Sequence, residues 1–493
     1  MHRSLRLAAC SLPALLAALL AACASTPPPD PATVIRQAEQ ALGSTALKTL
    51  VISGRGGGGT FGQAWQPGLA WPGLNYSLLT RSMNFETGAF REEFARGRSE
   101  PTGGGATPLM GQGEARATGL ARDGFAWSPA ATGGTPGPVA LHARVHDLWT
   151  GTPQGALKAA ARYRATAGTR TVGGSTFNTL SYTAPGQYAA TLVLDMSGLV
   201  TRIESTLPHP VTGDTSVVTE FSGYKDFGGV RFPARIQQSQ GAFPVLDLAV
   251  TEVRADTAVD ITVPDNVRSA RENVVVEKVT DGVWFLAGGS HNSVAIELSN
   301  QIVLVESPLY DGRALAVFDA ANQLVPGKKV LTVINSHHHF DHAGGLRTAV
   351  AQGAQLITSE LAKPYFERVL ANPNRIAPDR LAQAGNPAPR IVGVRGQSAL
   401  NDSLRRIEIH EMQGSVHAQG FLMVWLPAEK LLIEADAYTP GPPNSPPPPV
   451  VNANHLSLVQ NFERLGMAPT RILPLHGRVV PTSELYTQIG RQP

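Results

Sequence analysis

The segment that most constrains this chain is residues 335–345, which read Asn-Ser-His-His-His-Phe-Asp-His-Ala-Gly-Gly. It follows the apolar, β-branched run 330–334, so we expect it to leave the end of a buried strand. Four of its side chains follow the pattern His-x-His-x-Asp-His: His337, His339, Asp341 and His342. Imidazole nitrogen and carboxylate oxygen are ligands that zinc and similar divalent metals accept. Because four ligands on one turn crowd a single tetrahedral ion, the pattern predicts two adjacent ions that divide them.

The same pattern resembles the signature of the metallo-β-lactamase-fold hydrolases. In that family three more ligands stand at the ends of later strands, and this chain has candidates in the family's order: His417, Asp436 and His476. The resemblance covers residues 273–493 and implies an αββα sandwich. The elements read from the residues, consecutive strands followed by alternating helices and strands, suit the same architecture.

The resemblance also implies a role for each ligand. One ion is held by a first set: His337, His339 and His417. The other is held by a second set: Asp341, His342 and His476. Asp436 bridges both ions. The implied chemistry is hydrolysis by a hydroxide shared between two ions, with Asp341 orienting it and passing a proton to the leaving group. Zinc is the expected metal, and iron and manganese stay open as alternatives.

Other histidines and one loop lie outside this ligand set. Residues 288–292 occupy the loop that flanks the substrate in the family's fold, so His291 is expected to contact substrate, with a turn role as the alternative. Four histidines have no partner at ligand spacing and are expected to face solvent: His142, His146, His209 and His410. The proline-rich loop 440–449 is expected to be either a lid or a rigid connection.

The first residues of the chain predict export and anchoring. Arg3 and Arg6 precede a short apolar run, and Leu-Ala-Ala-Cys ends it at Cys23. This resembles a bacterial lipoprotein signal over residues 1–22, with lipidation at Cys23 and a proline-rich tether over residues 23–32. The resemblance implies an envelope protein held at the outer membrane and facing the periplasm. Plain signal-peptidase cleavage with an incidental cysteine is the alternative.

Cysteine usage and charge exclude several classes of protein. The chain has two cysteines, Cys10 and Cys23, so its body offers no disulfide framework, cysteine nucleophile or thiolate metal ligand. The formal net charge of +3 and the absence of a basic run argue against a nucleic-acid partner. A small molecule is the expected substrate, and the sequence does not indicate an oligomeric state.

Residues 33–265 have the texture of an antiparallel β domain, with short alternating runs between Gly, Pro and Asn turns. Residues 194–200 and 224–233 resemble turns of the half-barrel found in outer-membrane lipoprotein carriers, and a plain packing or spacer module is the alternative. A charged linker then leads to the hydrolase domain at residue 273. The chain is therefore expected to be an α+β protein of two folded domains.

The leading functional hypothesis is a membrane-anchored, metal-dependent hydrolase acting on an ester, a thioester, a lactone or a related substrate. A zinc β-lactamase is the alternative, although Asp436 stands near where those enzymes have cysteine or serine. An alternative of another class is a lipid- or lipoprotein-handling protein that acts through the N-terminal domain.

Overall fold

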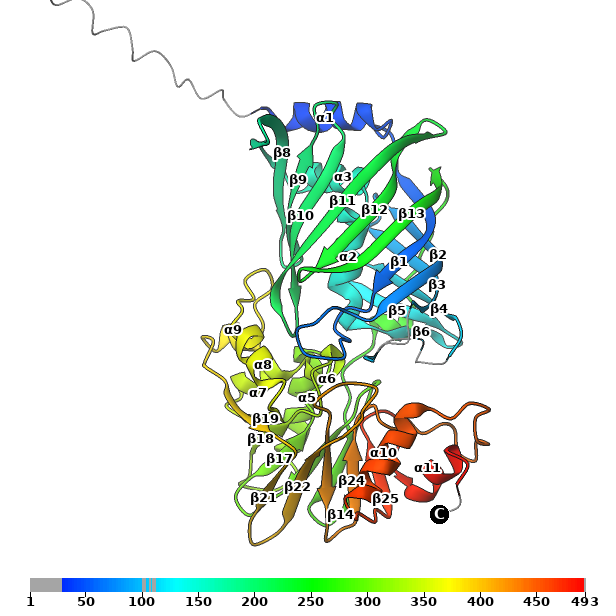
Figure 1. Cartoon of the computed structure of the whole chain (residues 1–493). Coiled ribbons are helices and arrows are strands. Elements are labelled where there is room, and N and C mark those ends of the chain that lie inside the picture. Colours follow the sequence, from blue (N-terminus) through cyan, green and yellow to red (C-terminus); the bar gives the residue numbers. More distant parts are fainter. Residues whose placement is uncertain (1–28, 100–102, 106–107, 109–111, 492–493) are drawn as a thin grey trace, which may run out of the picture.

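The computed structural model describes residues 29–99, 103–105, 108 and 112–491. The expected signal segment, Cys23 and most of the tether lie outside these residues. The chain forms an N-terminal β domain and a C-terminal layered domain, which meet around helix α6 in Figure 1. Within the described ranges, no helix combines the length and apolar character needed to cross a membrane.

The N-terminal domain is built on one antiparallel sheet of 13 strands, in the order β6-β5-β4-β3-β2-β1-β13-β12-β11-β10-β9-β8-β7. Its strands are β1 (Thr49–Gly59), β2 (Gly73–Asn84), β3 (Ala89–Arg98), β4 (Ala115–Arg122), β5 (Phe125–Ala130), β6 (Gly133–Pro136), β7 (Thr166–Val172), β8 (Ser175–Ala184), β9 (Tyr188–Leu194), β10 (Val200–His209), β11 (Gly213–Phe227), β12 (Val230–Gln240) and β13 (Phe243–Ala255). Strands such as β11 alternate buried and exposed side chains, because one face packs on a core and the other meets solvent. The expected large antiparallel domain is confirmed.

Helices fill the inner face of this sheet. They are α1 (Pro31–Ala41), α2 (Leu141–Thr150) and α3 (Pro153–Arg162), with a short 3-10 turn η1 (Pro138–Ala140) before α2. The sheet curves around α2, which contacts β3, β4 and β5 on one side and β9 and β10 on the other (Figure 1). Helix α1 begins at Pro31 and is capped by the side chain of Asp30. The expected domain start at residue 33 therefore falls inside a helix.

Two of the histidines expected to face solvent are buried. His146 lies on the face of α2 that packs on the sheet, where its Nε2 is 2.7 Å from the Ser205 hydroxyl. His410 is buried on β22 (Arg406–Glu411), with Nε2 3.0 Å from a Glu408 carboxylate oxygen. A histidine without a partner at ligand spacing can therefore still be buried. His146 is contacted by Ser205, which is distant in sequence, and His410 is contacted by Glu408 on the same strand.

The C-terminal domain has two sheets packed face to face. The first is ordered β14-β15-β16-β17-β18-β19-β20 and the second β21-β22-β23-β24-β25-β26. The strands of the first are β14 (Val275–Thr280), β15 (Val283–Ala287), β16 (Ser293–Glu297), β17 (Ile302–Val305), β18 (Val330–Ile334), β19 (Gln355–Ser359) and β20 (Arg390–Val394). Those of the second, besides β22, are β21 (Gln397–Asn401), β23 (Leu422–Leu426), β24 (Leu431–Glu434), β25 (Arg471–Pro474) and β26 (Val480–Pro481). Strands β17 to β20 run parallel.

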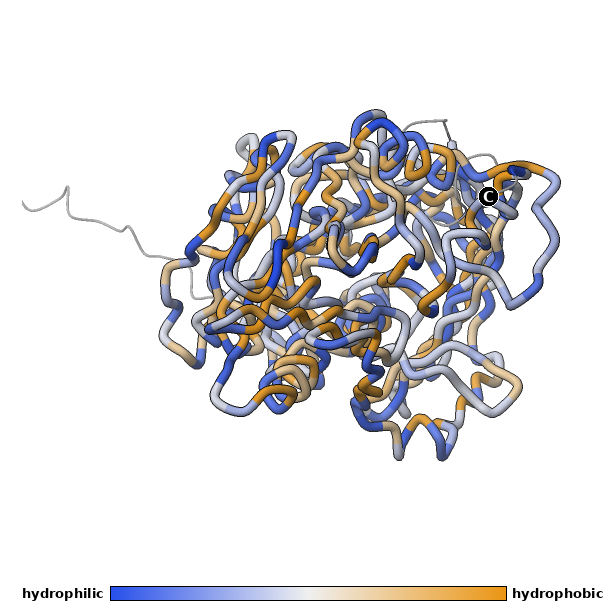
Figure 2. The backbone as a smooth tube through the Cα atoms, turned by 90° about the horizontal axis from the view of Figure 1, so that it is seen from below, coloured by the Kyte–Doolittle hydropathy of each residue, from blue (hydrophilic) through white to orange (hydrophobic). Residues whose placement is uncertain are grey.

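Helices cover both outer faces of this sandwich. Beside the first sheet lie α5 (Asp311–Ala321), α6 (Phe340–Ala343), α7 (Leu346–Ala351), α8 (Lys363–Leu370) and α9 (Arg380–Gln383), and beside the second α10 (Ala453–Arg464) and α11 (Thr482–Gln488). One hydrophobic core joins the two sheets with α10 and α11, and another joins the first sheet with α5, α7 and α8. Figure 2 shows hydrophobic segments running through the interior and hydrophilic ones in many peripheral turns.

The N-terminal unit extends past its expected end at residue 265. Helix α4 (Asp265–Arg268) contacts β5 and β6, and Val267 joins a small buried core with Trp127 and Val263. The segment between the domains is therefore short, because β14 already begins at Val275.

Candidate metal centre

The histidine-rich segment turns sharply at the end of β18, between two parallel neighbours. The backbone N–H of Asn335 donates to the carbonyl of Ile357 on β19, at 2.8 Å. The next N–H, of Ser336, donates to Oε1 of Glu306 at the end of β17, at 2.6 Å. Helix α6 then begins directly after His339. Because both neighbouring strands fix this turn, the following side chains project from the edge of the first sheet toward the second.

Ligand atoms of eight residues converge there in two groups. The first group is His337, His339, His417 and Asp436, and the second is His291, Asp341, His342 and His476. Within each group the ligand atoms all lie within 4.8 Å of one another. Three of these residues stand on loops of the second sheet: His417 precedes β23, Asp436 follows β24 and His476 follows β25. These eight residues are called the cluster below.

Asp436 lies between the two groups. Its Oδ2 is 2.7 Å from Nε2 of His342 and 3.3 Å from Nε2 of both His337 and His417. Its Oδ1 is 3.0 Å from Nε2 of His476. One carboxylate therefore contacts imidazoles of both groups, as a ligand shared between two ions requires.

The nitrogen and oxygen atoms of the cluster are arranged as ligands of metal ions rather than as hydrogen-bond partners of one another. Nε2 of His417 lies 3.2 Å from Nε2 of His337, and Nε2 of His476 lies 3.2 Å from Nε2 of His342. Three buried atoms of the cluster make no hydrogen bond: Nδ1 of His339, Nδ1 of His342 and Oδ2 of Asp436. Convergent nitrogen and oxygen donors without sulfur suit zinc and its neighbours.

Burial and charge set the protonation of the cluster. Burial, followed by repulsion from neighbouring histidines, holds the pKa of His337 and of His339 well below the usual range. Burial would also lower the pKa of His342, but Asp436, Asp341 and Glu306 outweigh it and raise that pKa well above its usual range. Burial opposes ionisation of Asp436, yet His342 and other cluster imidazoles hold its pKa well below the usual range. His337 and His339 thus offer neutral imidazoles, the form that binds metal.

Glu306 is a supporting residue that the sequence did not point out. Its side chain is fully buried, and Oε2 lies 3.2 Å from Nδ1 of His342. The two atoms make no hydrogen bond, but the carboxylate charge beside the ring helps to raise the pKa of His342 and supports this side of the cluster. The only sequence signal was a charged residue at the end of the apolar strand β17. Its backbone φ of 70° shows that the chain accepts an unfavourable conformation to place this carboxylate.

His291 and His338 lie in different surroundings. Nε2 of His291 is 3.2 Å from Oδ2 of Asp341, and burial lowers the pKa of this histidine to about 4. His291 is thus part of the second group as well as of the loop expected to flank substrate. His338 turns away from the cluster, and its Nε2 donates to the carbonyl of Ala64 at 2.7 Å.

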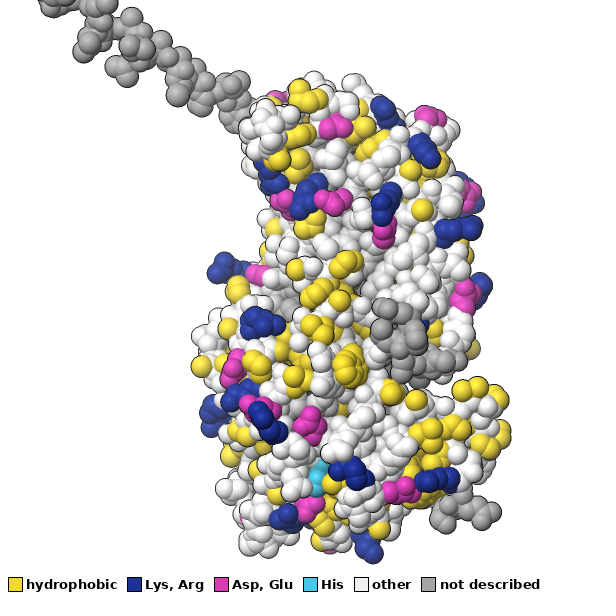
Figure 3. Space-filling view, viewed as in Figure 1, with side chains coloured by type: hydrophobic (Ala, Val, Ile, Leu, Met, Phe, Trp, Pro, Cys, Tyr) yellow, Lys and Arg dark blue, Asp and Glu magenta, His cyan; other side chains and the backbone are white. Residues whose placement is uncertain are grey.

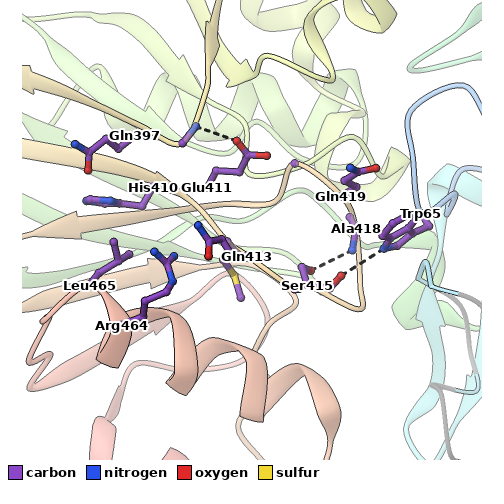
Figure 4. Close-up of a pocket in the computed structure, with 14 residues that line it drawn as sticks. Trp65, Gln397, His410, Glu411, Gln413, Ser415, Ala418, Gln419, Arg464 and Leu465 are labelled. Atoms are coloured by element: carbon purple, nitrogen blue, oxygen red, sulfur yellow. Dashed lines mark hydrogen bonds between the residues drawn. The ribbon is translucent and has the colours of Figure 1, made fainter.

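A cavity of about 570 Å³ lies beside the loop that carries His417. Its lining includes Trp65, Gln413, Ser415 and Gln419 (Figure 4), and no cluster residue belongs to it. The cluster itself meets solvent through Asp341, whose side chain is 33% exposed, and through Asp436 and His476 at 18% each. The approach to the centre is therefore on the carboxylate side.

The C-terminal part of the chain is similar to known proteins. Residues 286–478 match the model of the Metallo-beta-lactamase superfamily. The alpha subunit of 2,4-dinitroanisole O-demethylase from Nocardioides sp. (strain JS1661) is 24% identical over 184 residues, which are 37% of this chain and 52% of that protein. The chain thus spans about half the length of this relative.

The chain is also similar, at low identity, to solved structures. A metallo-β-lactamase from Pontibacter korlensis is 16% identical, with a TM-score of 0.34, and the match covers 44% of this chain and 98% of that one. One from Hirschia baltica is 19% identical, with a TM-score of 0.32, covering 45% and 99%. The matched residues 286–478 contain the whole cluster. This part of the chain therefore matches a domain of the metallo-β-lactamase superfamily.

Proposed function

We propose that the C-terminal domain is a hydrolase that uses two metal ions, with zinc as the expected metal. The observation that carries the proposal is the position of Asp436, whose carboxylate contacts imidazoles of both groups at 2.7–3.3 Å. The first ion takes His337, His339 and His417 as ligands. The second takes Asp341, His342 and His476. Asp436 is their common ligand.

When bound, two such ions lower the pKa of a shared water and stabilise negative charge on the substrate oxygen. Asp341 supplies the acid–base step. Burial opposes its ionisation, but His342 and His291 hold its pKa well below the usual range, so the carboxylate is charged at neutral pH. It can orient a water molecule, accept a proton from it and return that proton to the leaving group.

The proposed substrates are esters, thioesters, lactones and related molecules. The cluster provides ligands, a charged carboxylate and an opening on one side, and these features suit attack on a carbonyl without a serine or cysteine nucleophile. A zinc β-lactamase remains a candidate within the same chemistry. The name of the curated relative adds an aryl methyl ether to the compounds worth testing.

The test is metal analysis of the purified full chain, followed by hydrolysis assays. We expect about two ions per chain, and loss of activity on chelation with recovery when zinc is returned. The assay panel consists of an aryl ester, a thioester, a lactone, a chromogenic β-lactam and 2,4-dinitroanisole. A chain that retains no metal, with activity insensitive to chelation, contradicts the proposal.

We also propose that the enzyme is lipid-anchored at Cys23, at the outer membrane and facing the periplasm. The support is the sequence of residues 1–23, with its positive start, apolar run and Leu-Ala-Ala-Cys ending. Replacing Cys23 with Ser is expected to release the protein from the membrane fraction, and unchanged association contradicts the anchor. We do not propose lipid handling, because the described inner face of the N-terminal sheet is packed with side chains and helices.

A further inference from the structure

The N-terminal domain reaches into the metal centre through the connection between β1 and β2. Residues 61–65 of this connection, called the capping segment below, lie at the junction of the domains (Figure 1). We propose that the capping segment is a positioning element of the centre, in which Gln63 holds Asp341 and the Ala64 carbonyl fixes the tautomer of His339. This inference rests on the proposed metal centre and assigns the N-terminal domain a part in it.

Gln63 acts on the carboxylate of Asp341. Its Nε2 donates to Oδ1 of Asp341 at 2.9 Å, while Nε2 of His291 lies 3.2 Å from Oδ2 on the other side. The side chain of Asp341 is 33% exposed, so packing alone does not prevent its rotation. Contacts on both oxygens fix the plane of the carboxylate and thus the direction in which it can accept a proton.

The carbonyl of Ala64 acts on His339. It accepts hydrogen bonds from Nε2 of His339 at 2.9 Å and from Nε2 of His338 at 2.7 Å. A carbonyl only accepts, so His339 must carry a hydrogen on Nε2. Nδ1 is then the nitrogen with a free lone pair, and it is buried without a partner beside the rings of His337 and His417. Supporting contacts of this kind fix the ring orientation of metal-binding histidines.

The capping segment is held on two of the loops that carry ligands of the first group, the turn with His339 and the loop with His417. Gly62 accepts a hydrogen bond from the backbone N–H of Phe340, at 3.2 Å. Its φ of 84° favours glycine, and an added Cβ would lie 2.4 Å from the Phe340 ring. The carbonyl of Trp65 accepts from the N–H of Gln419, at 2.8 Å, two residues after His417.

Aromatic packing adds to this attachment. Phe61 contacts the ring of Phe340 edge to face, with centroids 5.1 Å apart, and Trp71 packs against both rings. Figure 3 shows hydrophobic side chains gathered on this face where the domains meet. The segment therefore sits on the turn that carries His339 and Asp341, so its position and theirs are linked.

The first test compares Gln63→Leu with Gln66→Leu in the full chain. Both replace an amide with an apolar group of similar size, but the Gln66 amide bonds Gln419 rather than Asp341. We expect Gln63→Leu to keep its metal content, to lower kcat by about 10-fold or more with little change in KM, and to alter the pH profile. Its cobalt-substituted form should show a changed absorption spectrum, since the geometry at Asp341 changes. Gln66→Leu should match the wild type in all of these measurements.

The second test displaces the segment. Gly62→Ala pushes it away from Phe340, and Gly88→Ala is the control, because Gly88 has φ of 70° in the same domain with nothing within 4 Å of an added Cβ. We expect Gly62→Ala to weaken metal affinity by about 10–100-fold in competition with a chelator, as losses of supporting contacts do. Gly88→Ala should retain the wild-type affinity.

Two kinds of failure are distinguishable. Wild-type protein that binds two ions, with Gln63→Leu and Gly62→Ala unchanged in cobalt spectrum, affinity and kcat, overturns the role of the capping segment and leaves the proposed hydrolase intact. Wild-type protein that binds no metal overturns both. Equal losses in Gln63→Leu and Gln66→Leu also overturn this inference, because they indicate a general interface effect.

Discussion

The two domains contribute to the same centre through contacts of very different range in the sequence. In the C-terminal domain, four cluster residues stand within the six positions from His337 to His342. In the N-terminal domain, Gln63 is 278 positions from the Asp341 that it contacts. The ligands of the C-terminal domain form a spacing pattern that can be recognised in the sequence. The contact between Gln63 and Asp341 produces no such pattern. A domain can therefore be part of a site without carrying any recognisable motif for it.

The largest effect is expected where both ions depend on one residue. Asp436→Ala should lower occupancy of both ions together and reduce turnover by more than the roughly 100-fold seen for supporting residues. His476→Ala removes a ligand of one ion only, so about one ion per chain should remain. Metal per chain, measured beside turnover, separates the two variants. Equal metal loss in both would show that the C-terminal ligands do not divide as proposed.

The next effect separates chemistry from metal binding. Asp341→Asn keeps the size of the side chain and one oxygen ligand but removes the charge that accepts a proton. Turnover should fall by about 100-fold or more, with a smaller loss of metal. Paired metal analysis and steady-state kinetics test this. Full activity in Asp341→Asn would contradict the acid–base role of Asp341 and, with it, the proposed role of Gln63 in positioning this carboxylate.

A smaller effect is expected from Glu306→Gln. The amide removes the negative charge that lies 3.2 Å from Nδ1 of His342 and helps to raise the pKa of that ring. Affinity for one ion should fall by about 10–100-fold in chelator competition. Glu434→Gln is the control, because burial, with Asp436, raises the pKa of Glu434 well above its usual range and the amide resembles the protonated acid. Wild-type affinity in Glu306→Gln contradicts this role.

The smallest effect on the centre is expected from the core of the N-terminal sheet. Leu192 is fully buried on β9, and Leu192→Ala should destabilise this domain by about 2–5 kcal/mol. Below the unfolding transition the metal content should be unchanged, because β9 lies outside the capping segment. Thermal unfolding with metal analysis measures both, and Met196→Ala, at a side chain 84% exposed, is the control. Loss of metal from the folded Leu192→Ala protein would show that the whole sheet supports the centre.

Most of the features that could be predicted from the sequence came from patterns of residues close together in the chain. The His-x-His-x-Asp-His spacing and the apolar run before it predicted the turn after β18, and alternating runs predicted an antiparallel N-terminal domain. Helices α2 and α3 were not expected, since their small and polar residues, such as Gly155 and Gln154, resemble turns unless the surrounding sheet is known. Long-range pairing thus decides which face of these helices is buried.

The supporting residues escaped the sequence for a related reason. Glu306 reaches the turn because β17 and β18 are parallel neighbours, and Ala64 acts through its carbonyl, which every residue possesses. Spacing cannot reveal a backbone contact between domains. Such contacts follow from the tertiary structure alone.

The pairing of β1 with β13 has a consequence for the order of folding. Leu50 lies opposite Ala255, and these strands are neighbours at the centre of the N-terminal sheet. Pairings so distant in sequence form slowly, since a long loop must close first. During synthesis from the N-terminus, this sheet cannot be completed before about residue 255 has emerged. The capping segment follows β1 closely, but its partners Phe340, Asp341 and Gln419 belong to the C-terminal domain. The completed sheet therefore brings the segment to the junction, and the segment becomes fixed only when the later-made domain docks on it.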